Sequence, residues 1–557
     1  MAAARVNRQT VPCGSDCHER ASEVETAMTV ESAERVPVLI VGGAYTGLST
    51  ALGLASRGVP PMLVERRATT STLPKAWGLN SRTHELLSTI PGVAAALHDA
   101  QKDVRLPLVK SGPTVRDARA ADVPEDLLAR YRMLTAAPAC WLPQATIERI
   151  LRGRAEELGA DLRFGTELVS WTQDADGVTA VVRATGDGRE YRVHADYLVA
   201  ADGYTSPIRT SLGIGVEGGG RIGHVYVITF EADLDAYFEE GRFCVTGLPG
   251  SGMSVIHDSM GTRTLWVDYF PEQGQSEADF TEDLCRDRVR RAVGDPGLEC
   301  RIVNARPFTL NHQLAERFRA GRVILAGDAA HACPPVGGQG GNLAIQDGYD
   351  LAWRLALVLG GQAGEALLDT YQAERRPVVN ITLEREVALQ AVADGRVLST
   401  FDPSQPIPTP REILGFRYHS PAVRTEPGDD HALQEDPENP TGRPGSRAPH
   451  VRLERDGLAL STHDLFGPGF VLLTDAEGTA WADAAANVAR YLGITLTAHQ
   501  IGGRIRDAEG VWRRRYGIEA GGATLVRPDA MIAWRSRTAA AGPERELENA
   551  LTAILAR

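Results

Sequence analysis

The stretch VPVLIVGGAYTG, residues 36–47, decides the fold. Its first half is an apolar run that predicts a buried strand, and its second half is a glycine-rich turn. Residues 48–57 then predict a helix, and Gly58 stands where a glycine commonly ends one. A second apolar run, residues 61–64, ends on Glu65. Together these segments predict a β-α-β unit of about 30 residues, which is the core of an α/β fold.

The turn has the composition of a binding site for a dinucleotide pyrophosphate. Such a site needs backbone N–H donors at a helix N-terminus, and glycines let the backbone approach the phosphates. Glu65 follows Gly42 by 23 residues, a spacing that lets its carboxylate accept a ribose hydroxyl. Ala44 replaces the middle glycine of G-x-G-x-x-G, so φ there must be negative, and Tyr45 is bulky for such a turn. The alternative is a tight strand–helix connection that binds nothing.

A second glycine-rich stretch, GDAAHACPPVGGQGGNLAIQD, occupies residues 327–347 and follows another apolar strand. Asp328 comes directly after that strand and is well placed to bond a sugar hydroxyl. The glycines from Gly337 to Gly341 leave N–H groups open at the start of a helix predicted over 341–359. A reduced flavin carries negative charge near its N1–C2=O edge, which a helix N-terminus stabilises by about 0.3–2 kcal/mol. We expect His331 to brace this loop, with a catalytic role as the alternative.

The remaining segments predict three domains. Alternating β-prone residues over 167–200 predict an antiparallel ribbon that closes on Ala201-Asp-Gly203. We expect a discontinuous Rossmann-like domain at 36–214 and 311–401, a β-sheet-rich domain inserted at 215–310, a linker at 402–449 and a last domain at 450–557. The last domain reads strand, helix, three strands, helix, which is typical of a thioredoxin-like fold. Because it contains no cysteine, it is expected to perform no dithiol chemistry.

Composition excludes several classes of function. The 557 residues are 43% hydrophobic and 24% charged, as in a soluble globular protein. The 59 basic and 72 acidic residues give a net charge of -13, which disfavours a nucleic-acid partner. No apolar run approaches the length of a membrane span, so no membrane partner is expected. Residues 1–35 lack a signal peptide and predict a disordered leader, either native or foreign to the natural protein.

The cysteines indicate a reduced, cytoplasmic protein without a metal. Seven cysteines are scattered along the chain, an odd number that does not suggest a disulfide framework. Cys13 and Cys17 are not followed by a second cysteine or histidine pair at zinc-finger spacing. Basic residues are almost all arginine, and the three lysines are Lys75, Lys102 and Lys110.

Three motifs in order make the chain resemble a known family, the FAD-dependent aromatic hydroxylases, or group A flavoprotein monooxygenases. It is most similar to the bacterial hydroxylases of aromatic polyketides of the anthracycline and angucycline type. The motifs are Gly42–Gly47 with Glu65-Arg66, Ala201-Asp-Gly203 with Ser206 and Arg209, and Gly327–Asn342. Shorter likenesses are Gly78-Leu-Asn with Arg82-Thr83, Leu142-Pro-Gln144, Tyr371–Pro377, Gly445–Pro449 and Leu525–Asp529. The resemblance covers about residues 36–540.

The resemblance implies an FAD-binding domain at 36–214 and 311–401 and a substrate domain at 215–310. It implies that Glu65 holds the adenosine ribose, Gln144 a ribityl or phosphate oxygen, and Asp328 the ribityl chain. Asp202 and Gly203 are implied to touch both FAD and a transiently bound NADPH or NADH. Lys75 stands where many relatives carry arginine, and Ala44 and Ala530 replace commoner glycines. The full set of expected cofactor residues is Gly42, Gly43, Ala44, Tyr45, Thr46, Gly47, Glu65, Arg66, Lys75, Gln144, Asp202, Gly203, Asp328, Pro335, Gly337, Gly340, Gly341 and Asn342.

The resemblance also implies a reaction. Reduced flavin and O2 form a C4a-hydroperoxide that delivers one oxygen to a phenolic ring of a polycyclic, polyketide-like substrate. A base that ionises the phenol would help, but no spacing selects one among His224, Tyr226, Trp266 and Tyr269. Baeyer–Villiger oxidation and epoxidation on the same scaffold remain alternatives, as does a flavin-binding protein without turnover or a plain NAD-dependent dehydrogenase. A flavin halogenase is disfavoured because no Trp-x-Trp-x-Ile motif occurs. The enzyme is expected to be a monomer or a homodimer.

Overall fold

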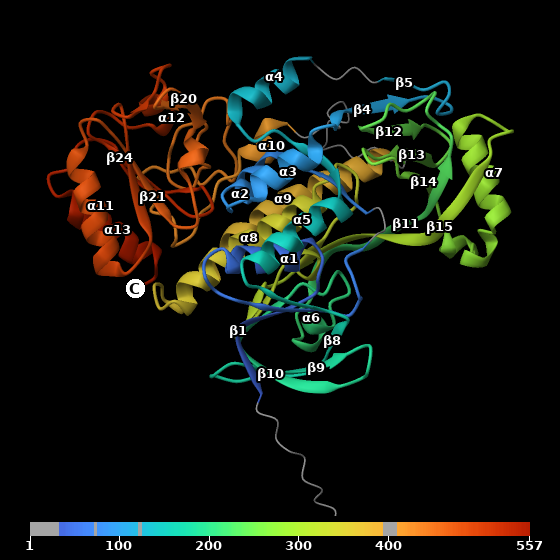
Figure 1. Ribbon diagram of the computed structural model, residues 1–557, viewed down its shortest axis with the longest axis horizontal. Coiled ribbons are helices and arrows are strands. Elements are labelled where there is room, and N and C mark those ends of the chain that lie inside the picture. The colour runs from blue at the N-terminus through green and yellow to red at the C-terminus, as the bar shows by residue number, and fades with distance from the viewer. Residues whose placement is uncertain (1–32, 72–74, 121–124, 394–408) are drawn as a thin grey trace, which may run out of the picture.

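The computed structural model describes residues 33–71, 75–120, 125–393 and 409–557, shown in Figure 1. The predicted leader therefore lies outside the described residues up to residue 32, as do Cys13 and Cys17, and Glu34 and Arg35 already belong to the first strand. Three large sheets carry the fold, and helices pack between and around them, so the α/β class predicted from the sequence is confirmed.

The first sheet contains the predicted β-α-β unit. Its order is β16-β17-β10-β1-β2-β7, and β9 and β8 extend it from β10 as the predicted antiparallel ribbon. The five strands from β17 to β7 run parallel. The strands are β1 (Glu34–Val41), β2 (Met62–Glu65), β7 (Asp161–Phe164), β8 (Thr166–Gln173), β9 (Val178–Ala184), β10 (Glu190–Ala200), β16 (Arg319–Ala320) and β17 (Val323–Leu325).

Helices cover this sheet, and two of them approach each other closely. Gly53 of α1 lies so near α8 that an added Cβ would come within 2.6 Å of the Cβ of Ala352. Gly348 of α8 faces Ser49 in the same way, so small residues on both helices set the close packing. The helices of this part are α1 (Tyr45–Ala55), α2 (Ser81–Ser88), α3 (Val93–Gln101), α4 (Glu125–Leu134), α5 (Gln144–Glu157), α6 (Pro207–Ser211), α8 (Gly340–Leu359) and α9 (Asp369–Ala393). A small ribbon of β3 (Trp77–Leu79) and β6 (Cys140–Pro143) lies beside them.

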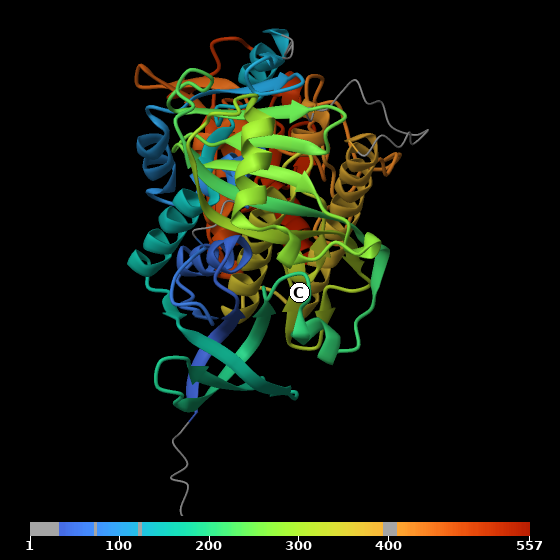
Figure 2. The ribbon, with the colours of Figure 1, turned by 90° about the vertical axis from the view of Figure 1, so that its right-hand side faces the viewer.

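The second sheet has the order β18-β15-β11-β14-β13-β12-β4-β5. Two of its strands, β4 and β5, come from residues 105–120, which we expected in the Rossmann-like domain. The sheet is therefore not contained within 215–310. One face packs on α7 (Glu282–Val293), which lies in front of the sheet in Figure 2. The strands are β4 (Arg105–Ser111), β5 (Arg119–Ala120), β11 (Val216–Ala232), β12 (Arg242–Leu248), β13 (Met253–His257), β14 (Arg263–Asp268), β15 (Cys300–Ala315) and β18 (His331–Ala332).

The C-terminal domain has the predicted order of strand, helix, three strands and helix, with additions at one edge. Its sheet runs β20-β19-β23-β22-β21-β24-β25. Helices α11 and α13 bury one face, and Trp512 of α12 lies in the core on the other. The elements are β19 (Arg452–Arg455), β20 (Leu458–Ser461), β21 (Phe470–Asp475), α11 (Thr479–Leu492), β22 (Leu496–Ile501), β23 (Ile505–Arg506), α12 (Trp512–Tyr516), β24 (Ala523–Val526), β25 (Ile532–Ser536) and α13 (Pro543–Ile554).

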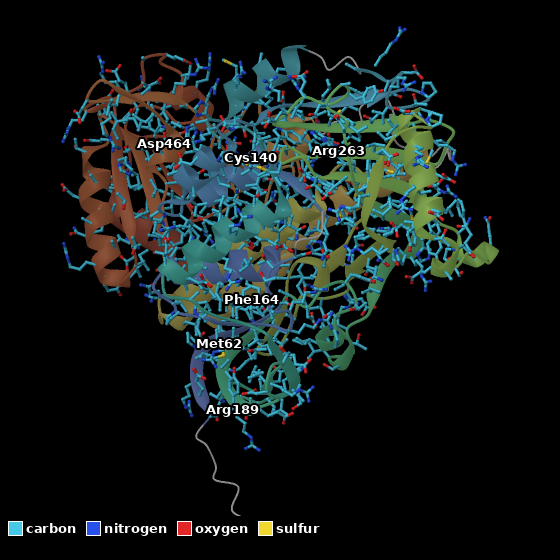
Figure 3. All side chains as sticks on the ribbon, turned by 45° about the vertical axis from the view of Figure 1, so that its right-hand side comes forward. Met62, Cys140, Phe164, Arg189, Arg263 and Asp464 are labelled. Carbon is cyan, nitrogen blue, oxygen red and sulfur yellow. The ribbon has the colours of Figure 1, made fainter. Side chains whose placement is uncertain are left out.

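The first part of the expected linker lies outside the described residues. The described chain resumes at residue 409, and α10 (Pro410–Leu414) begins at the next residue. From there to 449 the chain is packed, with Arg417, Ser446 and Arg447 buried. Figure 3 marks the three parts of the molecule by Phe164 in the first sheet, Arg263 in the second and Asp464 in the C-terminal domain. No helix in the described part of the chain combines the length and the apolar character that crossing a bilayer requires.

Candidate active site

Four of the expected residues lie at the carboxyl ends of four neighbouring parallel strands. Asp328 comes after β17, Asp202 after β10 and Gly42 after β1, while Glu65 ends β2, and these strands are adjacent in that order. Because the carboxyl ends of parallel strands meet at one edge of a sheet, the three motifs are brought together from segments more than 250 residues apart. In open α/β sheets this edge is where ligands bind.

The glycine turn after β1 leaves no room for side chains at two positions. Gly42 has a φ of +115°, and a Cβ there would collide with the carbonyl oxygen of Ala201 after β10. A Cβ on Gly47 would collide with the carbonyl oxygen of Gly42. Ala44 has a φ of -97°, so the negative φ that its methyl group requires is present. The turn therefore keeps the close backbone approach of a phosphate-binding loop despite the missing glycine.

Glu65 accepts hydrogen bonds from two backbone amides, one in this turn and one just after β2. The N–H of Gly43 donates to Oε2 at 2.8 Å, and the N–H of Arg67 donates to Oε1 at 2.9 Å. Each carboxylate oxygen retains a second acceptor site, so a ribose hydroxyl can still bind. Arg66 is exposed beside it.

The second motif is folded around Asp202. The Ser206 hydroxyl donates to Asp202 Oδ1 at 2.6 Å, and the N–H of Ile208 donates to Oδ2 at 3.2 Å. Burial raises the pKa of Asp202, and the hydrogen bond from Ser206 opposes this. Arg209 donates to the carbonyl oxygens of Tyr204 and Ala329 at 2.9 and 2.8 Å. Arg209 therefore ties the second motif to the third through hydrogen bonds to carbonyl oxygens. Gly203 has a φ of +88°.

The third motif is fixed by a buried carboxylate. Asp347 of α8 accepts from the N–H of Gly327 at 3.1 Å and lies 2.5 Å from His331 Nε2. Arg375 donates to its other oxygen at 2.7 Å. Burial would raise the pKa of Asp347, but His331 and Arg375 lower it to about 2. His331 thus braces the loop, while Asp328 is exposed.

The glycines before α8 place its first turn against other motifs. Asn342 Oδ1 accepts from the N–H of Asn80 at 2.8 Å, which connects the third motif to the Gly78-Leu-Asn stretch. A Cβ on Gly341 would lie 3.0 Å from the ring of Tyr45, and one on Gly340 would lie 2.9 Å from Cys333 Sγ. Gly337 has a φ of +89°, and Pro335 lies just before it in the same loop. A 20-residue helix begins there, so its unpaired N–H groups and dipole favour negative charge at this point.

Lys75 and Gln144 lie beside a buried carboxyl group. Gln144 begins α5 and donates to Glu148 Oε1 at 2.6 Å. Burial raises the pKa of Glu148 to about 7, against the effects of Gln144 and Lys75. Burial and the positive charges of Arg67 and Arg306 lower the pKa of Lys75, whereas Glu148 and Asp328 raise it. Lys75 therefore belongs to a group of charges that includes the predicted cofactor residue Asp328.

Aromatic side chains gather on the face of the second sheet opposite α7. Trp266 lies 6.4 Å from Trp77 and 5.9 Å from Phe308, measured between ring centroids. Phe243 lies 5.8 Å from Trp77 and is stacked on Trp141 at 5.7 Å. We call these five residues the aromatic cluster. Arg306, which acts electrostatically on Lys75, is two residues before Phe308 on β15, so side-chain alternation puts it on the same face.

The other expected substrate residues lie on the opposite face of this sheet. Tyr226 is stacked on Phe280 at 3.7 Å, and Tyr269 lies 5.6 Å from the same ring. Both belong to the core packed on α7, and His224 lies 6.0 Å from Tyr269. The structure therefore brings Trp266 to the aromatic cluster and places His224, Tyr226 and Tyr269 elsewhere.

These residues fit a bound FAD. The glycine turn provides the close backbone approach that a pyrophosphate needs, and carboxylates stand at three strand ends where ribose and ribityl hydroxyls would lie. Three residues near them, Asp347, Glu148 and Arg306, were not selected from the sequence. A cavity of about 230 Å³ elsewhere, lined by residues that include Lys110, Tyr237 and Arg242, touches none of the expected residues.

Comparison with known proteins identifies the family of this chain. Residues 35–386 match the FAD binding domain family, and residues 441–557 match the aromatic-ring hydroxylase C-terminal family. The chain is 40% identical over 545 residues to aklavinone 12-hydroxylase RdmE of Streptomyces purpurascens, covering 94% of this chain and 99% of that one. It is 39% identical over 553 residues to a 4-methyl-5-nitrocatechol 5-monooxygenase of a Burkholderia species, covering 94% and 98%. A crystal structure of aklavinone-11 hydroxylase with FAD and aklavinone superposes with a TM-score of 0.87 at 40% identity, covering 94% and 99%.

Proposed function

Because this chain belongs to the FAD-dependent aromatic-ring hydroxylases, and is thus an FAD-dependent monooxygenase, we propose that it hydroxylates a polycyclic, polyketide-like phenol. One oxygen atom of O2 enters the ring, and NADPH or NADH supplies the electrons. Bound FAD supplies the electron transfer and the activation of O2. The observation that supports the proposal most directly is the row of motif residues at four strand ends, together with the aromatic cluster on the facing sheet.

The protein holds the cofactor through backbone amides and through side-chain carboxylates. In the proposal, the turn at Gly42–Gly47 binds the pyrophosphate and Glu65 binds the adenosine ribose. Asp328 and Gln144 bind the ribityl chain, and the N–H groups from Gly340 to Asn342 face the pyrimidine edge of the flavin. The reduced nicotinamide binds transiently beside Asp202-Gly203. The resemblance to the family implies this division, and the acceptors and donors that each position offers support it.

The aromatic cluster suits a flat substrate with several rings. Offset and edge-to-face ring contacts contribute about 0.5–1.5 kcal/mol each beyond the area that they bury. Lys75 and Arg306 add positive charge near this face, which favours the phenolate over the phenol and so makes the ring a better nucleophile. No base is assigned, since Tyr226, Tyr269 and His224 lie on the far side of the sheet.

The test is turnover by the purified, FAD-loaded protein. We expect NAD(P)H oxidation that depends on a polycyclic phenol, and a product that carries one atom from labelled O2. A panel that includes nitrocatechols distinguishes a monocyclic from a polycyclic substrate, because one relative is named for each kind. Protein that retains FAD but forms no oxygenated product with any member of the panel would favour a flavin-binding protein without turnover.

The structure of the product separates the remaining reactions. A new phenolic hydroxyl supports hydroxylation. A lactone identifies Baeyer–Villiger oxidation and an oxirane identifies epoxidation, and either one would overturn the hydroxylase proposal while leaving the monooxygenase class intact. Comparing NADPH with NADH at equal concentration assigns the reductant. Sedimentation of the loaded enzyme distinguishes a monomer from a homodimer.

A further inference from the structure

A hairpin formed by residues 415–435 carries three side chains of types that bind metal ions. The backbone of residues 415–417 pairs antiparallel with that of 433–435. If this register is continued by two residues, His419 stands opposite His431. Asp429 lies two residues before His431 in the same hairpin. None of these residues belongs to the candidate active site.

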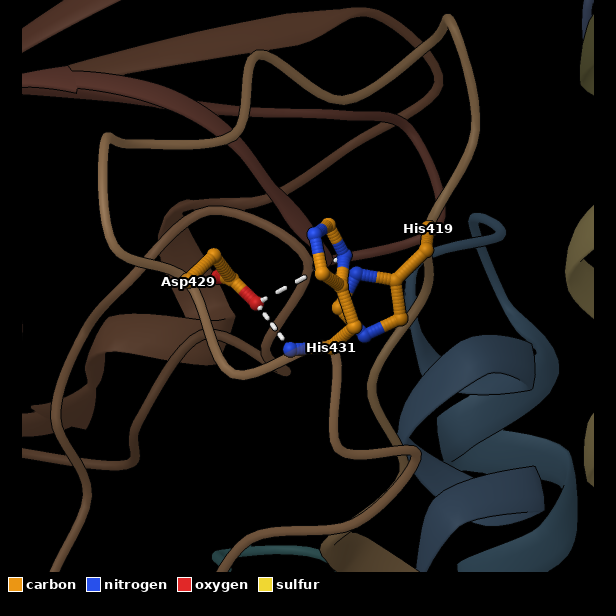
Figure 4. Close-up of side chains that lie close together, drawn as sticks. All are labelled: His419, Asp429 and His431. Atoms are coloured by element: carbon orange, nitrogen blue, oxygen red, sulfur yellow. Dashed lines mark hydrogen bonds and ion pairs between the residues drawn. The ribbon is translucent and has the colours of Figure 1, made fainter.

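The three side chains are turned toward one another, as Figure 4 shows. One potential ligand atom from each of His419, Asp429 and His431 lies within 4.8 Å of the others. The centroids of the two imidazole rings are 5.3 Å apart, and His431 Nδ1 is 4.0 Å from Asp429 Oδ1. The hairpin therefore gathers two nitrogens and one oxygen around a common point.

Surrounding groups orient two of these ligands. His419 Nε2 lies 3.1 Å from the carbonyl oxygen of Ala432 and must donate to it, which leaves the lone pair on Nδ1. That Nδ1 is buried and has no hydrogen-bond partner within the described ranges. Asp429 is 3% exposed, and Arg417 donates to its Oδ2 at 2.6 Å. A carbonyl behind a histidine and a donor behind a carboxylate are the usual outer partners of metal ligands.

We propose that His419, Asp429 and His431 bind a zinc ion through His419 Nδ1, a carboxylate oxygen and an imidazole nitrogen of His431. Two nitrogens and one oxygen suit Zn²⁺, whereas Mg²⁺ and Ca²⁺ prefer sites made of oxygen. The imidazole of His431 is 72% exposed, so it can rotate to shorten the separations to those of a tetrahedral site. Water completes the coordination from the solvent side.

Another cluster of possible ligands carries no such inference. Asp350, Glu374 and Asp529 also lie within 4.8 Å of one another and are buried. Arg354 and Arg527 pair with them, so their charge is already neutralised. In the hairpin Arg417 also pairs with Asp429, but His419 Nδ1 has no hydrogen-bond partner among the described residues, whereas the second cluster offers carboxylates alone.

The test is titration of Zn²⁺ alone into chelator-treated, FAD-loaded enzyme without an affinity tag. Cys13→Ser/Cys17→Ser serves as the background, so that these two thiols do not bind the metal. We expect one equivalent to bind with a micromolar Kd, and Mg²⁺ not to compete. His431→Asn should weaken binding about tenfold or more, because one of three protein ligands is lost.

Asparagine is the replacement of choice because His431 has a φ of +51°, which asparagine tolerates. His98→Ala, at an exposed histidine of α3, is the matched control and should bind Zn²⁺ as the background does. Cobalt in place of zinc should show the absorption of a tetrahedral ion in the background and not in His431→Asn. The proposal is overturned if the background protein binds no equivalent, or if His431→Asn binds with unchanged affinity.

Discussion

Glu386 is a buried carboxyl group whose ionisation should lower the free energy of unfolding by an amount that can be estimated. It lies on α9, its side chain is 0% exposed, and its Oε2 has no hydrogen-bond partner among the described residues. Arg385 donates to Oε1 at 3.2 Å but also pairs with Glu412. Burial raises the pKa of Glu386 to about 8, with Arg385 acting in the opposite direction. The carboxyl group is therefore protonated in the folded protein over a pH range in which it is ionised in the unfolded chain.

The direction of the pH effect follows from proton binding. Between the unfolded pKa of 4.5 and the folded value of about 8, the folded state holds a proton that the unfolded state has lost. Stability from this group is thus complete below the lower value and decreases as the pH rises to the upper one. The difference corresponds to about 4–5 kcal/mol in the free energy of unfolding at 1.36 kcal/mol per pKa unit. Glu386→Gln, which cannot ionise, should escape this loss.

The assay is urea unfolding of FAD-loaded protein at several values between about pH 5 and about pH 9. The stability of Glu386→Gln relative to wild type should increase with pH by a few kcal/mol across this range. Glu384→Gln, at an exposed glutamate two positions before Glu386 on the same helix, should show a constant difference from wild type. Parallel curves for wild type and Glu386→Gln would refute the assignment of a buried, neutral carboxyl group.

Three further substitutions, one of them with a matched control, test the cofactor site and the domain contacts. Gly47→Ala should yield protein without the visible absorption of FAD, because its Cβ would collide with the backbone of the turn. Lys75→Arg should change the rate of flavin reduction or the KM for the aromatic substrate, since a planar guanidinium replaces a compact ammonium among the charges around Asp328. Lys102→Arg, at an exposed site, should leave both unchanged. Arg527→Met should lower the free energy of unfolding by about 3–5 kcal/mol, because it leaves Glu374 without one partner of a buried ion pair. The urea midpoint measures this loss.

Much of the cofactor region was predictable because its signals are local. Each motif residue follows an apolar run, and the end of a buried parallel strand is where a polar residue reaches a ligand. The condition on Ala44 was also local, since a methyl group tolerates only one sign of φ, and the structure has -97°. The thioredoxin-like order of elements was predicted in the same way, from periodicity and turn residues.

The rest depends on contacts between distant segments. Asp347 is the last residue of the glycine-rich stretch 327–347, but its role requires Arg375 from the next long helix and His331 from the preceding loop. Strand β4 pairs with β12 across more than 120 residues, which no local pattern indicates. Tyr226 and Trp266 both lie on β-prone segments, and alternation alone does not say which face of a sheet meets the cofactor domain.

The C-terminal domain acquires a role from one of these distant contacts. The stretch Leu525–Asp529 contributes Arg527, which donates to both oxygens of Glu374 on α9 at 2.6 and 2.7 Å. On α8, Tyr349 donates to the carbonyl oxygen of Pro528 at 2.9 Å. Helix α8 begins at the proposed flavin site and carries Asp347, and α9 carries Arg375, which fixes Asp347. A domain without cysteine therefore holds in place the two helices that orient the third motif. For this reason a substitution within Leu525–Asp529 should reduce the retention of FAD as well as the free energy of unfolding.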